Sequence, residues 1–270
     1  ENNRIFENRS PSNGGGIYAY GSKLIYGSAD PTNIWKKDGK YYILAGNLLV
    51  LNKYGRKPEA PEDMKGDRLY LLESEDIENW TYKGVFYQRN PEWTEDSEDN
   101  MCPSFLPLPT SPDGGKPSGK HLLLFISHNK GCQYYIGAYD TQRDLFLPET
   151  HGRMSWVDNT FFAPEALIDG RGRQIMWAWL TDNARSETDD AIADGWCGVY
   201  GLPRVLWLGE DDTLRLAPAP ERDAGQHGLE FAFAFKDAAA HVFHGMREYA
   251  DFSACCSRNG CIQIASGDAF

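Results

Sequence analysis

Carboxylate side chains recur beside three X-Pro steps of this sequence, and a carboxylate can donate or accept a proton or bind hydroxyl groups. Asp30 stands immediately before Pro31, an acidic stretch leads into Cys102-Pro103, and Glu165 directly follows Pro164. Asp-Pro is also an ordinary way to begin a turn, so one such acid carries little weight. The three positions gain weight because the same kind of sequence follows each X-Pro step.

Each X-Pro step leads into an apolar run, then a polar turn with glycine before Lys or Arg, then a second apolar run. The paired runs are at 33–35 and 40–44, at 104–108 and 122–127, and at 166–168 and 174–180. Pro31, Pro103 and Pro164 are 72 and 61 residues apart. This spacing is too long for one hairpin but suits a four-stranded sheet with long loops. We interpret the runs as inner strands of successive blades of an all-β propeller.

Proline explains why a functional side chain could lie at each strand start. It lacks an N–H and biases its predecessor toward extended geometry, so it is tolerated at the first residue of a strand. The inner strands of a propeller line a central channel. We therefore expect Asp30 to lie at a strand mouth and to point toward one opening of that channel.

The segment between Gln88 and Asn100 is an acidic loop that feeds directly into Cys102-Pro103. An ionised carboxylate without partners is costly to bury. We therefore expect this loop at the rim of a blade, beside the strand mouth.

Bulk composition excludes several classes of function. The 270 residues carry a formal net charge of −12, which argues against a nucleic-acid surface, since that would need a basic patch. No apolar run approaches the roughly 18 residues of a membrane span, and no signal peptide is visible at the N-terminus. The six cysteines lack the paired spacing expected of a zinc site. We expect no nucleic-acid or membrane partner and no metal, and the sequence leaves the localisation unknown.

The sequence changes in character from about Asp223, where alanine-rich segments and the Cys255-Cys256 pair follow. We expect residues 1–222 to form a partial propeller domain. Residues 223–270 would then be a linker and the start of a second unit.

Five segments between Gly27 and Pro220 resemble, in order, motifs of glycoside hydrolase family 32, the invertase, levanase and inulinase family. They are residues 67–86, 102–108, 162–165, 175–179 and 195–206. The second, Cys-Pro-Ser-Phe-Leu-Pro-Leu, resembles that family's Glu-Cys-Pro-Asp-Phe-Phe-Pro box. One such match would be weak, but five in order at plausible spacing are specific.

The resemblance implies a five-bladed β-propeller, with its first blade incomplete or missing here, followed by the start of a β-sandwich. It implies a glycosidase that releases fructose from sucrose, inulin or levan by a retaining mechanism with two carboxylates and no cofactor. The expected partner is thus a carbohydrate. Fructosyl transfer to another sugar remains an alternative, as does a catalytically silent carbohydrate-binding propeller.

The resemblance also assigns candidate catalytic residues. Asp30 matches the transition-state stabiliser of the family's Arg-Asp-Pro box. It also resembles the nucleophile of the Asn-Asp-Pro-Asn-Gly box, but the sequence after it matches the second blade, so the nucleophile box is not found here. Met101 occupies the place of the family's acid/base glutamate and cannot transfer a proton. Glu98 is the candidate acid/base, with Asp99 as the alternative and as the neighbouring charge that would raise the pKa of Glu98. A solvated acidic loop is the structural alternative.

Candidate substrate-binding residues are Glu165, Asp158, Asn33 and Trp35. Glu165 could instead pair with Arg173 or Arg204. Trp35, Trp177 and Trp179 could stack on a sugar ring, although a place in the core is the commoner fate of an inner-strand tryptophan. His128 follows an apolar strand, and we expect it to be a satisfied histidine at the rim.

Overall fold

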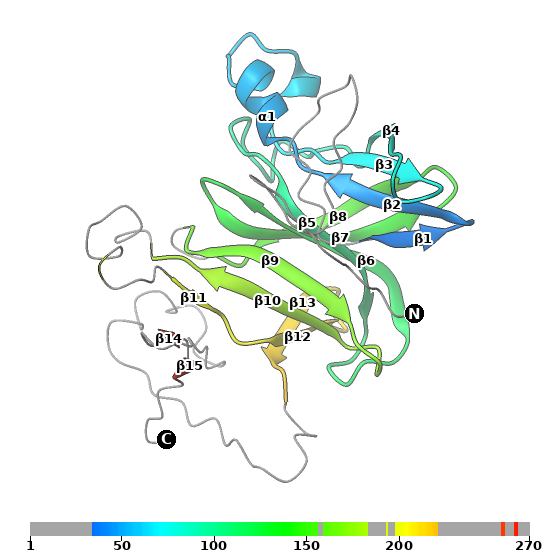
Figure 1. Cartoon of the computed structure of the whole chain (residues 1–270), viewed down its shortest axis with the longest axis vertical. Helices are drawn as coiled ribbons and strands as arrows, with labels where there is room; N and C mark the ends of the chain where they lie inside the picture. The colour runs from blue at the N-terminus through cyan, green and yellow to red at the C-terminus, as the bar shows by residue number, and fades with distance from the viewer. Residues whose placement is uncertain are drawn as a thin grey trace.

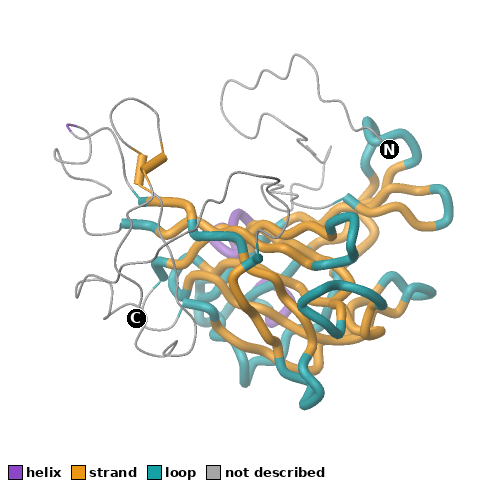
Figure 2. Tube along the Cα trace, turned by 90° about the horizontal axis from the view of Figure 1, so that it is seen from below, coloured by secondary structure: helices purple, strands orange, loops and turns teal. Residues whose placement is uncertain are grey.

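The computed structural model describes residues 34–155, 159–182, 193 and 198–220, and the backbone of two short strands nearer the C-terminus. Antiparallel strands make up most of this part of the chain, as Figures 1 and 2 show. They form three successive sheets, each built from strands that lie in one continuous part of the sequence. The described fold is therefore all-β, as the sequence predicted.

The first sheet has the order β1-β2-β3-β4. Its strands are β1 (Trp35–Lys37), β2 (Lys40–Ala45), β3 (Tyr70–Ser74) and β4 (Thr81–Val85). Asp38 and Gly39 join β1 to β2 with φ of 51° and 83°, as a two-residue hairpin turn requires. The segment between β2 and β3 holds three short helical pieces, which are α1 (Leu48–Val50), η1 (Leu51–Gly55) and η2 (Glu62–Met64).

The second sheet has the order β5-β6-β7-β8 and contains the longest strands. They are β5 (Met101–Pro109), β6 (Pro117–Ser127), β7 (Gly131–Asp140) and β8 (Leu145–Arg153). The third sheet runs β9-β10-β12-β13, and the short β11 pairs with the end of β10. Its strands are β9 (Phe161–Ile168), β10 (Gln174–Leu180), β11 (Val199–Tyr200), β12 (Arg204–Leu208) and β13 (Leu214–Pro218). A separate pair joins β14 (Cys255–Cys256) to β15 (Ile262–Gln263).

Two apolar clusters hold the three sheets face to face. Leu44, Leu71, Phe105 and Phe125 belong to a cluster between the first and second sheets. The cluster between the second and third sheets includes the following buried residues: Leu122, Leu124, Met176, Ala178 and Leu206. Side chains alternate across a strand, so a given apolar cluster receives every second residue of a central strand.

The three predicted hairpins are confirmed as β1-β2, β5-β6 and β9-β10. The strands of the second and third pairs are longer than the predicted runs. The paired strands also contain polar residues such as Lys120 and Glu165, which lie outside the apolar runs.

The predicted geometry of the X-Pro steps is wrong at both described copies. Cys102 and Ala163 have φ of 50° and 45°, which is left-handed and not extended. The two steps lie inside β5 and β9, not at the first residue of a strand. The strand register shifts between Met101 and Ser104 and again opposite Trp177 and Trp179. Each X-Pro step is thus part of a β-bulge, where an extra residue is accommodated by a local change of backbone direction.

The described residues contain three sheets of the blade type, so a five-bladed propeller would need two further sheets from outside them, not one. The five-blade count stays a prediction, and so does the boundary near residue 222. The predicted start of a β-sandwich lies outside the described residues except for the backbone of β14 and β15. Among the described residues, no helix is long and apolar enough to cross a membrane.

Candidate functional site

The residues of interest gather where β5 and β9 begin. β5 and β9 are the first strands of their sheets, and they contact each other. The acidic loop of residues 88–100 leads into β5, and Phe162 lies at the start of β9. Met101 pairs with Ile126 near the end of β6, which brings the turn after β6 to the same place.

Glu98 is 3 % exposed, and both of its carboxylate oxygens accept hydrogen bonds. The backbone N–H of Glu95 donates to Oε1 at 2.9 Å, and Nε2 of Gln133 donates to Oε2 at 2.7 Å. Oε1 of Gln133 in turn lies 2.8 Å from Nε2 of His151. Glu98 is therefore a buried connection between the acidic loop and β7 and β8. This geometry suits a structural role, and proton transfer by Glu98 stays a prediction.

Asp99 is 1 % exposed and binds His128 through both oxygens. The backbone N–H of His128 donates to Oδ1 at 3.0 Å, and Nδ1 of its imidazole lies 2.6 Å from Oδ2. The His128 side chain is 50 % exposed. A buried carboxylate thus orients an imidazole that reaches solvent, which is a common arrangement for a group that transfers protons. No local pattern predicts this pair, because Asp99 and His128 are brought together only by the pairing of β5 with β6.

Met101 is 4 % exposed and packs in the cluster between the second and third sheets. A Cβ on Gly46 would clash with its sulfur, so glycine at that position makes room for the methionine. Asn100 is held by Asn47, whose Oδ1 accepts from the Asn100 backbone N–H at 2.8 Å. Met101 fills core space here and carries no proton to transfer.

A buried hydroxyl network lies behind the acidic loop. Asp67 is completely buried and accepts hydrogen bonds from Tyr87, Thr94 and Tyr135, the last at 2.8 Å. Burial and then the nearby Asp67 charge raise the pKa of both tyrosines, so their hydroxyls stay protonated and act as donors. Asn100 also donates to the Tyr87 hydroxyl, at 2.9 Å. The network joins the loop to the first and second sheets.

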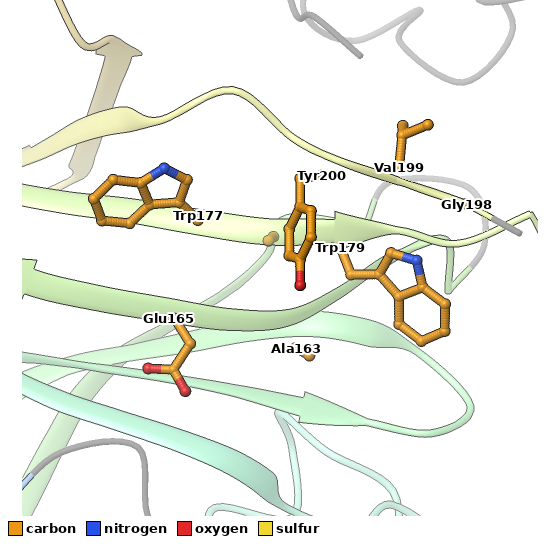
Figure 3. Close-up of a pocket in the computed structure, with 8 residues that line it drawn as sticks. Ala163, Glu165, Trp177, Trp179, Gly198, Val199 and Tyr200 are labelled. Carbon is orange, nitrogen blue, oxygen red and sulfur yellow. The ribbon is translucent and has the colours of Figure 1, made fainter. Parts of the chain in front are cut away.

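A hollow of about 490 Å³ lies on the third sheet (Figure 3). Its walls include Glu165 and three aromatic residues, Trp177, Trp179 and Tyr200. Trp179 is 40 % exposed and Tyr200 is 75 % exposed. Desolvation by the surrounding protein raises the pKa of Glu165 to about 7, although the residue as a whole is exposed. A carboxylate among exposed aromatic faces is a combination that suits a sugar, which offers both hydroxyls and apolar C–H faces.

The ring of Phe162 lies between the hollow and the Asp99–His128 pair. The Phe162 ring is 5.7 Å from the imidazole of His128 and 6.3 Å from the ring of Trp179, both edge-on. Glu165 and Phe162 both belong to β9. One end of the third sheet therefore places an aromatic-lined hollow beside an exposed imidazole.

The structure brings together only some of the residues predicted from the sequence. Asp30, Asn33 and Asp158 lie outside the described residues. Trp35 packs among aromatic rings between the first two sheets, 5.7 Å from both Tyr42 and Phe105. Its role in binding substrate stays a prediction. Tyr200 was missed, since nothing in the local sequence marks a two-residue strand as a wall of the hollow.

The acidic loop divides into two parts. Glu92, Glu95 and Asp96 are exposed at its surface, as expected of a rim. Glu98 and Asp99 are buried, and the hydrogen bonds above compensate their desolvation. The structural alternative, a solvated acidic loop, is therefore wrong for its last residues.

Comparison with known proteins identifies the family. Residues 26–220 match the sequence profile described as the glycosyl hydrolases family 32 N-terminal domain. The match covers well over half of the chain, and the chain therefore belongs to this family.

Curated relatives with known names cover the same region. A fructan 1-exohydrolase of Hordeum vulgare is 31% identical over 196 residues, which are 67% of this chain and 29% of the relative. "Beta-fructofuranosidase, insoluble isoenzyme 4" of Oryza sativa subsp. japonica is 30% identical over 207 residues, 71% of this chain and 31% of the relative. The chain thus spans about a third of the length of these relatives.

Solved structures support the fold. Fructan 1-exohydrolase IIa from Cichorium intybus aligns with a TM-score of 0.50 at 24% identity, covering 71% of this chain and 34% of that one. The β-fructofuranosidase BmSUC1 of Bombyx mori aligns with a TM-score of 0.50 at 20% identity, covering 78% and 39%. The three described sheets accordingly correspond to part of a β-propeller.

Proposed function

We propose that this chain is part of a β-fructosidase that releases fructose from sucrose, inulin or levan. The observation that carries the proposal is the family match over residues 26–220. The named relatives support the same substrate class, since they are a fructan exohydrolase and a β-fructofuranosidase. The aromatic hollow on the third sheet adds a surface that suits a sugar.

The proposed reaction is hydrolysis with retention. One carboxylate attacks the anomeric carbon and an acid/base group protonates the leaving oxygen, on opposite sides of an oxocarbenium-like transition state. Asp30 is the proposed transition-state stabiliser. The proposed nucleophile comes from outside the described residues.

Glu165 is the proposed substrate-binding carboxylate. Its raised pKa, about 7, means that near neutral pH it can either accept a hydrogen bond from a sugar hydroxyl or donate one. Trp177 and Trp179 offer flat faces for the apolar side of the ring. Asp158, Asn33 and Trp35 complete the proposed set of binding residues.

The test is the release of reducing sugar from sucrose, inulin and levan. It compares this chain with a form extended upstream of Glu1. Fructose release by the extended form supports the proposal. An Asp30→Asn variant should then fold normally and have a much lower turnover number, and unchanged turnover would remove Asp30 from the catalytic set.

Binding of fructan without hydrolysis is the second candidate function. Met101 favours it, because a buried thioether stands where the family has its acid/base glutamate. Product analysis with excess sucrose also separates hydrolysis from transfer to a second sugar. An extended form that folds and binds fructan, yet releases no sugar, would establish the binding function instead.

A further inference from the structure

We propose that Asn79 is an N-glycosylation site, at which the side-chain amide carries an oligosaccharide. Asn79, Trp80 and Thr81 form the triplet Asn-x-Thr, which is the acceptor sequence for asparagine-linked glycans in proteins that enter the secretory pathway. The site belongs to the first sheet, whereas the hollow lies on the third. The inference therefore does not depend on the proposed function.

The structure distinguishes this triplet from the other candidate acceptors. The sequence contains two Asn-x-Ser/Thr triplets, which begin at Asn8 and Asn79. Asn8 lies outside the described residues, and Pro11 follows its triplet directly. Asn100 begins a triplet with cysteine in place of the hydroxyl residue, but it is completely buried and donates to the Tyr87 hydroxyl at 2.9 Å. An oligosaccharide on Asn100 would have no room in this fold.

Asn79 is exposed in the turn that joins β3 to β4. Asp76 organises this turn, because its Oδ1 accepts from the backbone N–H groups of Glu78 and Asn79 at 2.9 Å and 2.8 Å. Its Oδ2 accepts from Nδ2 of Asn79 at 2.8 Å. An asparagine amide nitrogen carries two hydrogens, so one can donate to Asp76 while a sugar replaces the other. The turn thus presents the acceptor nitrogen at the surface and keeps its own hydrogen bond.

Trp80, the middle residue of the triplet, anchors the turn to the protein. It is half-buried and packs against the apolar cluster around Ile43. Its Nε1 donates to the backbone oxygen of Ile77 at 3.2 Å. Thr81 is the first residue of β4 and is exposed. The large side chain therefore packs inward, and the two residues that define the acceptor sequence stay at the surface.

The position of the turn in the blade leaves room for a glycan. β4 is the last strand of its sheet, and among the described strands it pairs with β3 alone (Figure 1). The first strand of a propeller blade lines the channel and the last lies at the outer rim, whereas neighbouring blades pack on its faces. Further blades of the propeller would therefore leave the outer edge of β4 uncovered.

The same turn lies away from the acidic loop. Turns of an antiparallel meander alternate between its two ends, so the β1–β2 and β3–β4 turns share one end of the first sheet. The connection between β2 and β3 and the segment after β4 lie at the other end, and that segment leads into residues 88–100. An oligosaccharide on Asn79 would therefore not obstruct the acidic loop.

The modification is a group transfer to the Asn79 amide. The donor is an oligosaccharide joined to a lipid through pyrophosphate, and an oligosaccharyltransferase catalyses the step. Nδ2 of Asn79 forms a bond to the anomeric carbon of the first sugar. The bond from that carbon to the pyrophosphate oxygen breaks, the lipid pyrophosphate leaves with the electron pair, and Nδ2 gives one proton to a base. The transferase recognises the hydroxyl of Thr81, which is why the triplet requires Ser or Thr.

The first experiment examines the full-length protein isolated from its own cells. Peptide N-glycosidase in heavy-oxygen water converts a glycosylated asparagine to aspartate and adds one heavy oxygen. Trypsin then releases residues 69–83, a peptide whose single asparagine is Asn79. We expect mass spectrometry to find the label in this peptide and to find Asn100 unlabelled.

The second experiment compares variants of the full-length protein that are secreted from one eukaryotic cell line behind the same signal peptide. Asn79→Gln removes the acceptor nitrogen, whereas Thr81→Ala leaves it in place and removes the hydroxyl. Both variants should carry one glycan fewer than the wild type. Thr81→Ser keeps a hydroxyl and should keep the glycan. Asn52→Gln is the matched control, because Asn52 is exposed in the loop between β2 and β3 but begins no triplet.

Several outcomes would overturn the inference. An unlabelled 69–83 peptide from the natural protein would show that Asn79 is not modified there. A glycan that is lost in Asn8→Gln and retained in Asn79→Gln would belong to Asn8. Retention in Thr81→Ala would mean that the triplet is not the acceptor sequence. If a variant is not secreted because it does not fold, the peptide measurement on the natural protein decides. Neither experiment measures fructose release, so failure of the proposed function leaves both results interpretable.

Discussion

Cys102 and Ala163 share one backbone conformation, with φ of 50° and 45°, and each precedes a proline within the first strand of its sheet. The sequence repeat is thus also a repeat in space, built on a bulge. Such a bulge changes the direction of the strand at the place where the acidic loop and Phe162 meet.

The left-handed conformation of Ala163 leads to the first prediction. An L-residue pays about 1–2 kcal/mol in this region, and glycine does not. Ala163→Gly should therefore leave the free energy of unfolding unchanged or raise it by up to about 1 kcal/mol, after the entropy that glycine adds to the unfolded chain. Ala166, in the same strand but buried, is the matched control, and Ala166→Gly should destabilise. Urea unfolding measures both, and equal losses would contradict the strained geometry.

Glu98 gives the second prediction. In Glu98→Gln, one carboxylate oxygen becomes an NH₂ group that faces a donor, either the Glu95 N–H or the Gln133 amide. Turning Gln133 over would also require His151 to change tautomer, since the other amide atom of Gln133 contacts the His151 ring. We expect a loss of about 1–3 kcal/mol in the free energy of unfolding. Glu92→Gln is the control, because Glu92 is exposed in the same loop, and a loss as large there would show that loop charge and not the buried bonds is responsible.

The hydroxyl of Tyr135 gives the third prediction. Tyr135→Phe removes a donor to the buried carboxylate of Asp67, and bonds to charged groups contribute about 1.5–3 kcal/mol. We expect the free energy of unfolding to fall by that amount, so that the variant unfolds at a lower denaturant concentration. Tyr134→Phe, at the neighbouring position of β7, removes a hydroxyl for which no hydrogen bond is found among the described residues and should change stability little. A small loss for Tyr135→Phe would mean that Tyr87 and Thr94 suffice to hold Asp67.

The sequence predicted hairpins well because they depend on local patterns. Apolar runs around Gly39 and Gly172, with a polar turn between them, are sufficient to place β1-β2 and β9-β10. The bulges could not be predicted, since a register shift depends on which residues the partner strand presents.

The site was harder to predict for the same reason. Whether Glu98 is solvated or buried depends on Gln133 from another strand. His128 acquires Asp99 only through the pairing of β5 with β6. Glu165 was found as a candidate from its X-Pro step, but its hollow needs Tyr200 from β11, which is distant in sequence.

The pKa of Glu165 gives the fourth prediction. It is raised from an ordinary 4.5 to about 7 by desolvation, so between these pH values the folded state binds more protons than the unfolded state. Stability should therefore fall as pH rises from about 4.5 to 7. Glu165→Gln removes this contribution. The melting temperature of the variant should therefore rise relative to that of the wild type as the pH increases over this range. Glu210→Gln, at an exposed position in the turn between β12 and β13, should show no such rise. A constant difference between Glu165→Gln and wild type would contradict the shift.

Trp179 gives the last prediction, which concerns ligand binding. Its ring is 40 % exposed on a wall of the hollow, and an exposed aromatic face that is not needed for the core is available to a sugar ring. Trp179→Ala should weaken fructan binding about tenfold, which corresponds to about 1.4 kcal/mol, with little loss of stability. Tyr54→Ala is the control, since Tyr54 is 47 % exposed but lies on η1, in the loop between β2 and β3 of the first sheet. Titration calorimetry with inulin oligomers measures both variants. Undiminished affinity in Trp179→Ala would exclude the hollow as a sugar site and leave Glu165 without its proposed role.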